Sequence, residues 1–178
     1  MGSKHAQDLR IRIDAAFGNL SRQLQGMDAH MERADAPGEW TTREVLSHLL
    51  FEPGFDPAAK LATFSERDYP VVELDAGATY LDDQRRQMTL PQFKDALEAQ
   101  RRHLLEYIDR LEEREFDRRK ARILLFKQFM GTDEITIDMY LGAMFDYHWN
   151  DHAGQLEKIR QATGLGSVDA ARPSGIPA

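Results

Sequence analysis

ITIDMYLGAMFDYHWNDHAGQLEKIRQAT, residues 135–163, carries an inward-facing stripe with a helical period. The stripe consists of Ile137, Tyr140, Leu141, Met144, Phe145, His148, His152, Gln155, Leu156 and Ile159. Spacings of three and four residues place these side chains on one face of an α-helix. Gly164 follows as a C-terminal stop signal. The stretch therefore predicts one long amphipathic helix.

Two stretches nearer the N-terminus show the same periodicity. Residues 6–33 carry an apolar stripe over seven helical turns, made of Leu9, Ile13, Phe17, Leu20, Leu24, Met27 and Met31. Thr41 and Glu44 have the spacing of a capping box and open a second helix. This helix is expected to end before Pro53, because proline cannot continue a helix. Trp40, just before the cap, is expected to pack there as a hydrophobic staple.

A third long helix is expected from Thr89 to Leu111, since Thr89 and Gln92 form another capping-box pattern. Its buried stripe is Phe93, Leu97, Gln100, Leu104, Tyr107, Ile108 and Leu111. Four such helices and no convincing sheet predict an all-α fold, a four-helix bundle.

The connections between the helices are long. Residues 53–88 join helices two and three, and Pro57 within them favours a short helix as far as Phe64. Residues 116–134 join helices three and four. The apolar run 123–126 in this connection fits either a strand or a helical turn, because periodicity cannot distinguish the two over so few residues.

Bulk composition excludes several classes of protein. The 178 residues suit a single domain, expected over 5–165 and followed by a disordered tail, 166–178. No cysteine is present, which excludes disulfides, thiolate metal sites and a cysteine nucleophile. A net charge of −7 without a basic face argues against nucleic-acid binding. No apolar run is long enough for a membrane span, so a cytoplasmic location is the default expectation.

His148 and His152 interrupt the stripe of the last helix at ligand spacing. Four residues correspond to about 6 Å along the axis, so both imidazoles leave the same face. Gln155 shares that face. Burying three polar side chains without partners costs several kcal/mol, and a divalent cation would be an efficient partner. The alternative is a pair of core histidines satisfied by hydrogen bonds.

A third ligand is expected from another helix, and His48 in the second helix is the candidate. Glu52, four residues later, shares its helical face and is a candidate fourth ligand or base. Glu44 is already explained by the capping box. The zincin motif is absent, because Trp149 stands where that motif needs its glutamate. Asp151 points about 100° away from the second histidine, so it is expected to be solvated or to support a ligand.

Two strings in the chain resemble the DinB-like (DinB/YfiT) superfamily of bacterial four-helix-bundle metalloenzymes. They are WTTREVLSHL at 40–49 and HWNDHAGQLEKIR at 148–160, and the likeness extends to TLPQF at 89–93 and to the helix order. The resemblance implies a divalent metal, zinc or nickel, held by His48, His148 and His152, and a homodimer. One departure is clear: Pro53-Gly54-x-x-Pro57 interrupts a stretch that is usually a continuous helix in such proteins.

Three functions remain open at this point. Three neutral histidines leave a coordination position free for water or substrate, as in catalytic sites. By resemblance, a thiol-dependent S-transferase using a low-molecular-weight thiol and a metal-dependent hydrolase are both candidates, each acting on a small-molecule substrate. The alternatives are a non-catalytic, stress-associated metal- or ligand-binding bundle and a bundle without metal.

The apolar stripe of the first helix and Tyr107 beside Ile108 offer more apolar surface than one core needs, which also favours a homodimer.

Overall fold

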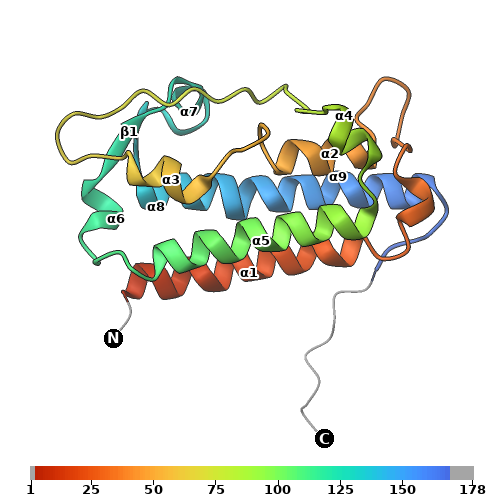
Figure 1. Ribbon diagram of the computed structural model, residues 1–178, viewed down its shortest axis with the longest axis horizontal. Helices are drawn as coiled ribbons and strands as arrows, with labels where there is room; N and C mark the ends of the chain where they lie inside the picture. The colour runs from red at the N-terminus through yellow and green to blue at the C-terminus, as the bar shows by residue number, and fades with distance from the viewer. Residues whose placement is uncertain (1–2, 169–178) are drawn as a thin grey trace, which may run out of the picture.

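The computed structural model describes residues 3–168 and forms an elongated helical bundle (Figure 1). Helix α1 (Lys4–Gln23) lies beside α5 (Leu90–Ile108). Helix α8 (Ile137–Leu141) continues through a π-helical segment, η2 (Gly142–Tyr147), into α9 (His148–Ala162), which packs against α1. Two short helices, α2 (Thr42–Leu49) and α3 (Pro57–Ala62), together take the fourth position. The predicted four-helix bundle is confirmed.

The direction of the helices explains the first long connection. The α2–α3 pair and α5 run the same way along the bundle, so the chain must return over its whole length between them (Figure 1). Residues 63–82 make this return along the outside of the molecule, and α4 (Asp83–Gln87) leads into α5. The interruption predicted around Pro53 is present, because α2 ends at Leu49 and α3 begins at Pro57.

The second long connection folds into a small unit at one end of the bundle. It contains α6 (Glu115–Arg118), β1 (Lys120–Arg122), α7 (Leu124–Met130) and β2 (Glu134–Thr136). Strands β1 and β2 are antiparallel, with Ala121 opposite Ile135. Of the two structures that the apolar run 123–126 allowed, the helical one forms, directly after β1.

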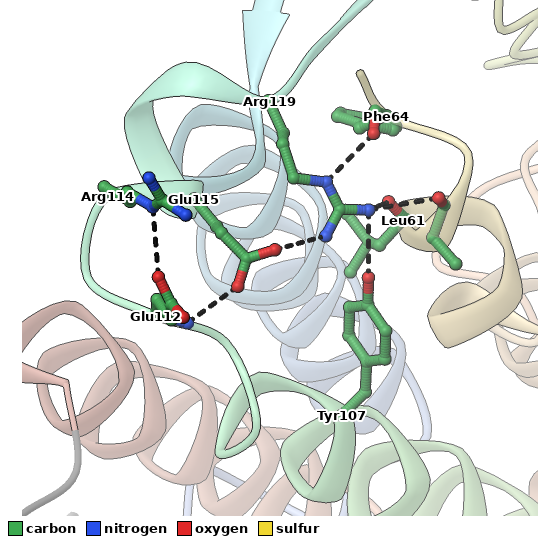
Figure 2. Close-up of polar contacts among 8 residues, drawn as sticks. Leu61, Phe64, Tyr107, Glu112, Arg114, Glu115 and Arg119 are labelled. Atoms are coloured by element: carbon green, nitrogen blue, oxygen red, sulfur yellow. Dashed lines mark hydrogen bonds and ion pairs between the residues drawn. The ribbon is translucent and has the colours of Figure 1, made fainter. Parts of the chain in front are cut away.

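Arg119 fastens this unit to the bundle (Figure 2). Its guanidinium donates to three backbone carbonyls at the end of α3: Leu61 at 2.9 Å, Ala62 at 3.0 Å and Phe64 at 2.9 Å. It also donates to the Tyr107 hydroxyl at 3.3 Å and pairs with Glu115 at 3.0 Å. A cation beside the last carbonyls of a helix is favourable. Tyr107, one of the residues behind the expected homodimer, thus has a polar partner within its own chain.

The core lies where the helical stripes meet, with one addition that the stripes did not include. Trp149 is fully buried, with ring centroids 5.9 Å from Phe17 and 5.4 Å from Phe145. The helical stripe in the sequence does not include it. The structure makes it the largest fully buried side chain of the described residues.

The first and last helices have boundaries that differ from the predictions, and α5 ends at Ile108 instead of Leu111. The first helix ends at Gln23 instead of Arg33, because Gly26 has a φ of 74° and turns the chain into a 3₁₀ segment, η1 (Asp28–His30). Met27 and Met31 are nevertheless buried, so the apolar stripe outlasts the helix. The last helix begins at Ile137 instead of Ile135, since Thr136 caps it by accepting from the Met139 amide at 3.1 Å.

Within residues 3–168, no helix is both long enough and apolar enough to cross a bilayer. The predicted disordered tail, 166–178, lies outside the described residues from position 169 onward.

Candidate metal centre

The three histidines singled out in the sequence lie together in one cluster. His48 comes from α2, and His148 and His152 come from the first two turns of α9. The Nε2 atom of His148 is 2.9 Å from Nε2 of His48 and 3.1 Å from Nε2 of His152. Across residues 3–168, this is the one group of three or more His, Asp or Glu side chains whose ligand atoms converge closely enough to hold a metal ion.

Hydrogen bonds on the outer ring nitrogens set the tautomers of two of these histidines. His48 Nδ1 lies 2.7 Å from the Ala78 carbonyl, which can only accept, so Nδ1 carries the proton. His152 Nδ1 donates in the same way to Gln155 Oε1 at 2.8 Å. Both rings therefore turn an unprotonated Nε2 toward the cluster. Metal-ligating histidines characteristically have an outer partner of this kind.

His148 stands between these two lone pairs. Its Nδ1 is buried and makes no hydrogen bond of regular geometry, although the Met144 carbonyl favours a proton there. With that proton on Nδ1, three Nε2 lone pairs face one another. If the proton of His148 were on Nε2 instead, it could be donated to Nε2 of His48 or of His152 but not to both. The lone pairs of the remaining nitrogens would still face one another. A cation at the centre would satisfy all three.

Burial keeps the three imidazoles neutral. It lowers the pKa of His48, His148 and His152, and that of His148 falls to about 3 because the other two rings also oppose a charge there. Neutral imidazole is the form that binds a metal. The site therefore needs no deprotonation step at neutral pH.

The spacing of the nitrogens fits a first-row divalent metal. Ligands held at about 2.0–2.1 Å, at angles between octahedral and tetrahedral, lie roughly 2.9–3.4 Å apart. The two separations from His148 are 2.9 and 3.1 Å, and all three ligand atoms lie within 4.8 Å of one another. Three protein ligands leave at least one coordination position free.

Aromatic rings surround the cluster. The ring of Trp40 lies 4.9 Å from that of His48 and 6.0 Å from that of His152, nearly parallel to the latter. Tyr80 covers His48 from another side at 6.3 Å. Trp40, expected as a staple at the start of α2, thus also forms a wall of the metal centre. Tyr80 belongs to the returning connection, where no sequence motif indicated it.

The other candidates around the cluster have separate positions. Glu52 is exposed and lies beyond the end of α2, because Phe51 adopts a φ of 59° and turns the chain away from the helical face. The expectation that it shares the face of His48 was wrong. Glu44 has the expected role, since its carboxylate accepts from the Thr41 amide at 2.8 Å. Gln155 supports His152, and the exposed Asp151 lines the cavity beside it.

Buried Arg85 holds the surroundings of His48 in place, and nothing in the sequence distinguished it from the exposed Arg86. Its Nη1 donates to the carbonyls of Ser47, at 2.9 Å, and of Phe51 and Tyr80. Tyr80 has a φ of 53°, an uncommon conformation for a residue other than glycine. Arg85 thus joins the end of α2 to the strained residue that covers His48.

The cluster forms part of the wall of a cavity of about 940 Å³. Apolar residues of α7, of α8, of η2 and of the returning connection supply much of the remaining wall: Leu74, Leu125, Phe126, Phe129, Met130, Met139 and Met144. The metal centre therefore faces a space large enough for an organic ligand.

Gln155→Leu is expected to weaken metal binding about 10–100-fold, the usual cost of losing an outer hydrogen-bond partner of a ligating histidine. The variant frees the His152 ring to rotate and to change tautomer. Competition with a chromophoric chelator measures the affinity. Gln161→Leu, on an exposed part of the same helix, is the matched control, and an equal loss in both variants would contradict the role given to Gln155.

The metal-free protein is expected to lose stability as the pH falls below about 6.5. The three histidines stay neutral in the folded state while they gain protons in the unfolded chain, so stability is complete above that pH and falls toward the His148 value of about 3. Each histidine contributes up to about 1.4 kcal/mol per pH unit. Urea midpoints between about pH 7.5 and pH 5 measure the slope. His148→Asn should reduce it, whereas an unchanged slope in that variant, or an equal reduction in His30→Asn, would refute the assignment.

The comparisons with known proteins bear on the fold. No protein-family model matches the chain, and no curated protein matches it significantly. One solved structure, YfiT from Bacillus subtilis, matches with a TM-score of 0.71 over 92% of this chain and 90% of that chain, at 14% sequence identity. It is described as a probable metal-dependent hydrolase with an unusual four-helix bundle topology. The resemblance that the two histidine strings indicated is thus confirmed at the level of architecture, and this chain has the four-helix-bundle fold of YfiT.

Proposed function

We propose that this chain is a metal-dependent hydrolase with its active centre at His48, His148 and His152. The observation that carries the proposal is the convergence of three neutral imidazole nitrogens, 2.9 and 3.1 Å apart, on one point in a cavity wall. The description of YfiT as a probable metal-dependent hydrolase supports the same class of reaction. Imidazole ligands suit zinc and nickel, and we propose one of these as the metal.

His48, His148 and His152 would hold the divalent metal, which would act as a Lewis acid toward a substrate carbonyl and would lower the pKa of bound water toward neutrality. The chain contributes the orientation of the ligands, since Ala78 and Gln155 hold the rings of His48 and His152 by their outer nitrogens. Trp40 and Tyr80 pack on these rings and keep water from their faces. Asp151 lines the same cavity, and its charge opposes in part the lowering of the His152 pKa by burial. We assign it as the proton acceptor.

A thiol-dependent S-transferase is the second function. The cavity of about 940 Å³ is larger than a small ester needs and could hold a low-molecular-weight thiol beside an electrophile. Three carboxylates, Asp75, Asp138 and Asp151, line it, however. They would repel a thiol that carries carboxylates of its own, which places hydrolysis first.

The decisive experiment combines metal analysis with turnover. Elemental analysis of the natively purified protein should give close to one zinc or nickel ion per chain. Ester and amide substrates should be hydrolysed by the metal-loaded protein, not by the chelated protein, and activity should return with zinc or nickel. Turnover of an electrophile only when a thiol is added would select the transferase. A protein that binds metal and turns over none of these substrates would select the non-catalytic binding protein.

A further inference from the structure

Helix α7 brings an apolar surface to the cavity. Four of its seven residues line the cavity, and we call them the α7 wall: Leu125, Phe126, Phe129 and Met130. Phe129 and Met130 remain 74% and 42% exposed, although they line the cavity. Apolar area left in water at the mouth of a cavity is area that a bound molecule could cover.

Charges around the cavity favour one sign of ligand. Three lining carboxylates, Asp75, Asp138 and Asp151, face a single lining cation, Arg12. Arg12 already has partners outside the cavity, because it pairs with Asp8 at 3.1 Å and with Asp146 at 3.0 Å. Asp8 and Asp146, the partners of Arg12, add two further carboxylates beside the cavity. A divalent metal would therefore offset only part of the negative charge and would not reverse its sign.

We propose that the cavity binds amphiphilic small molecules whose apolar portion covers the α7 wall and whose charged group, where present, is cationic. The volume of about 940 Å³ lies at the upper end of ordinary ligand pockets, which hold one molecule of moderate size. The inference rests on the proposed function in one respect only: the labile bond of such a molecule would lie at the three histidines.

The shape and charge of the site favour a small molecule over larger occupants. The α7 wall lines the same cavity as His48 and His148, so it is not a flat surface. A chain of net charge −7 would be repelled by an anionic membrane. A second copy of the chain on α7 is an outcome that the test below distinguishes.

Isothermal titration with decyltrimethylammonium, decanoate and tetramethylammonium tests the proposal, with each amphiphile kept below its micellar concentration. The long-chain cation should bind at least about 10-fold more tightly than either of the others, because only it matches both the apolar wall and the carboxylates. Equal or tighter binding of decanoate would overturn the charge assignment. Equal binding of tetramethylammonium would overturn the role of the apolar wall.

Matched variants locate the binding. Phe129→Ser should weaken the binding of decyltrimethylammonium about 10-fold, whereas Leu124→Ser should not, since Leu124 is 67% exposed on the same helix but does not line the cavity.

A second pair of variants tests the preference for a cation. Asp75→Asn keeps a side-chain acceptor for the Gly77 amide and should reduce the preference for the cation over decanoate. Asp83→Asn, exposed in α4, should leave that preference unchanged. Equal effects in a variant and its control would refute the assignment.

The design separates this inference from the proposed function. Binding is measured on metal-free protein, so it does not depend on catalysis. Amphiphile binding without hydrolysis of any ester would leave the inference standing and remove the hydrolase. Hydrolysis without selective binding of the cation would support the hydrolase and overturn the inference. A dimer that Phe129→Ser converts to monomer, in a protein that binds no amphiphile, would assign the α7 wall to a second copy of the chain and overturn the inference.

Discussion

His148→Ala is expected to abolish metal binding and every metal-dependent activity while leaving the fold intact. Its Nε2 lies 2.9 Å from that of His48 and 3.1 Å from that of His152, so the ring stands between the other two ligands. The loss of affinity should exceed the 10–100-fold that is typical when an outer partner is removed. The fold should survive because the long apolar stripes of the bundle hold it together, unlike the small core of a zinc finger.

Elemental analysis, circular dichroism and thermal melting of the purified variant check this expectation. His30→Ala, on η1 and outside the cluster, is the control and should retain the metal. Chelation of the unaltered protein should lower its melting temperature only modestly. Retention of one metal ion per chain by His148→Ala would refute the three-histidine centre. An unfolded metal-free protein would make the metal structural and would favour the binding protein over the enzyme.

Trp149→Ala is expected to destabilise the fold, whereas His148→Ala removes the metal and leaves the fold intact, although Trp149 and His148 are adjacent. Trp149 is fully buried and contacts the rings of Phe17 and Phe145. Its removal would leave a cavity between α9 and α1 and should lower the free energy of unfolding by about 3–5 kcal/mol. Since a domain is typically stable by only about 5–15 kcal/mol, much of the variant could be unfolded at physiological temperature.

Urea unfolding of both proteins in the metal-free state measures this difference. Tyr147→Ala is the matched control, because Tyr147 precedes His148 and is 74% exposed, so its removal should change stability by less than about 0.5 kcal/mol. A loss below about 1 kcal/mol in Trp149→Ala would show that the surrounding helices close the space, and the packing role given to Trp149 would be wrong.

Helical periodicity made the architecture predictable from the sequence. The stripes of α1, α5 and the last helix are long enough to define a buried face, and the capping boxes at Thr41 and Thr89 are both present. The same periodicity placed His148 and His152 on one face. His48 could be named as the candidate third ligand, and the family resemblance supported it, but periodicity could not place it beside the pair, because two separate helices meet only through tertiary packing.

The surroundings of the metal centre could not be predicted in the same way. The carbonyl of Ala78, the ring of Tyr80 and the guanidinium of Arg85 come from an irregular connection with no repeating pattern. Their roles follow from how that connection crosses the bundle. Glu52 was placed near His48 by helical spacing, and this prediction failed. Helix α2 ends at Leu49, a few positions early, so Glu52 no longer shares the face of His48.

The π-helical segment η2 has a consequence for how distant relatives should be aligned. Each residue inserted into a regular α-helix rotates everything after it by about 100°, whereas a wider turn can absorb the insertion where it occurs. Gly142–Tyr147 lies directly before His148, so the phase of the histidine face is set here and not by the distance from the start of α8. Homologues with a regular helix at this point should lack one residue between these boundaries and still present the same pair of ligands. Alignments should therefore allow a one-residue gap at 142–147, because an ungapped motif search through this helix would miss such chains.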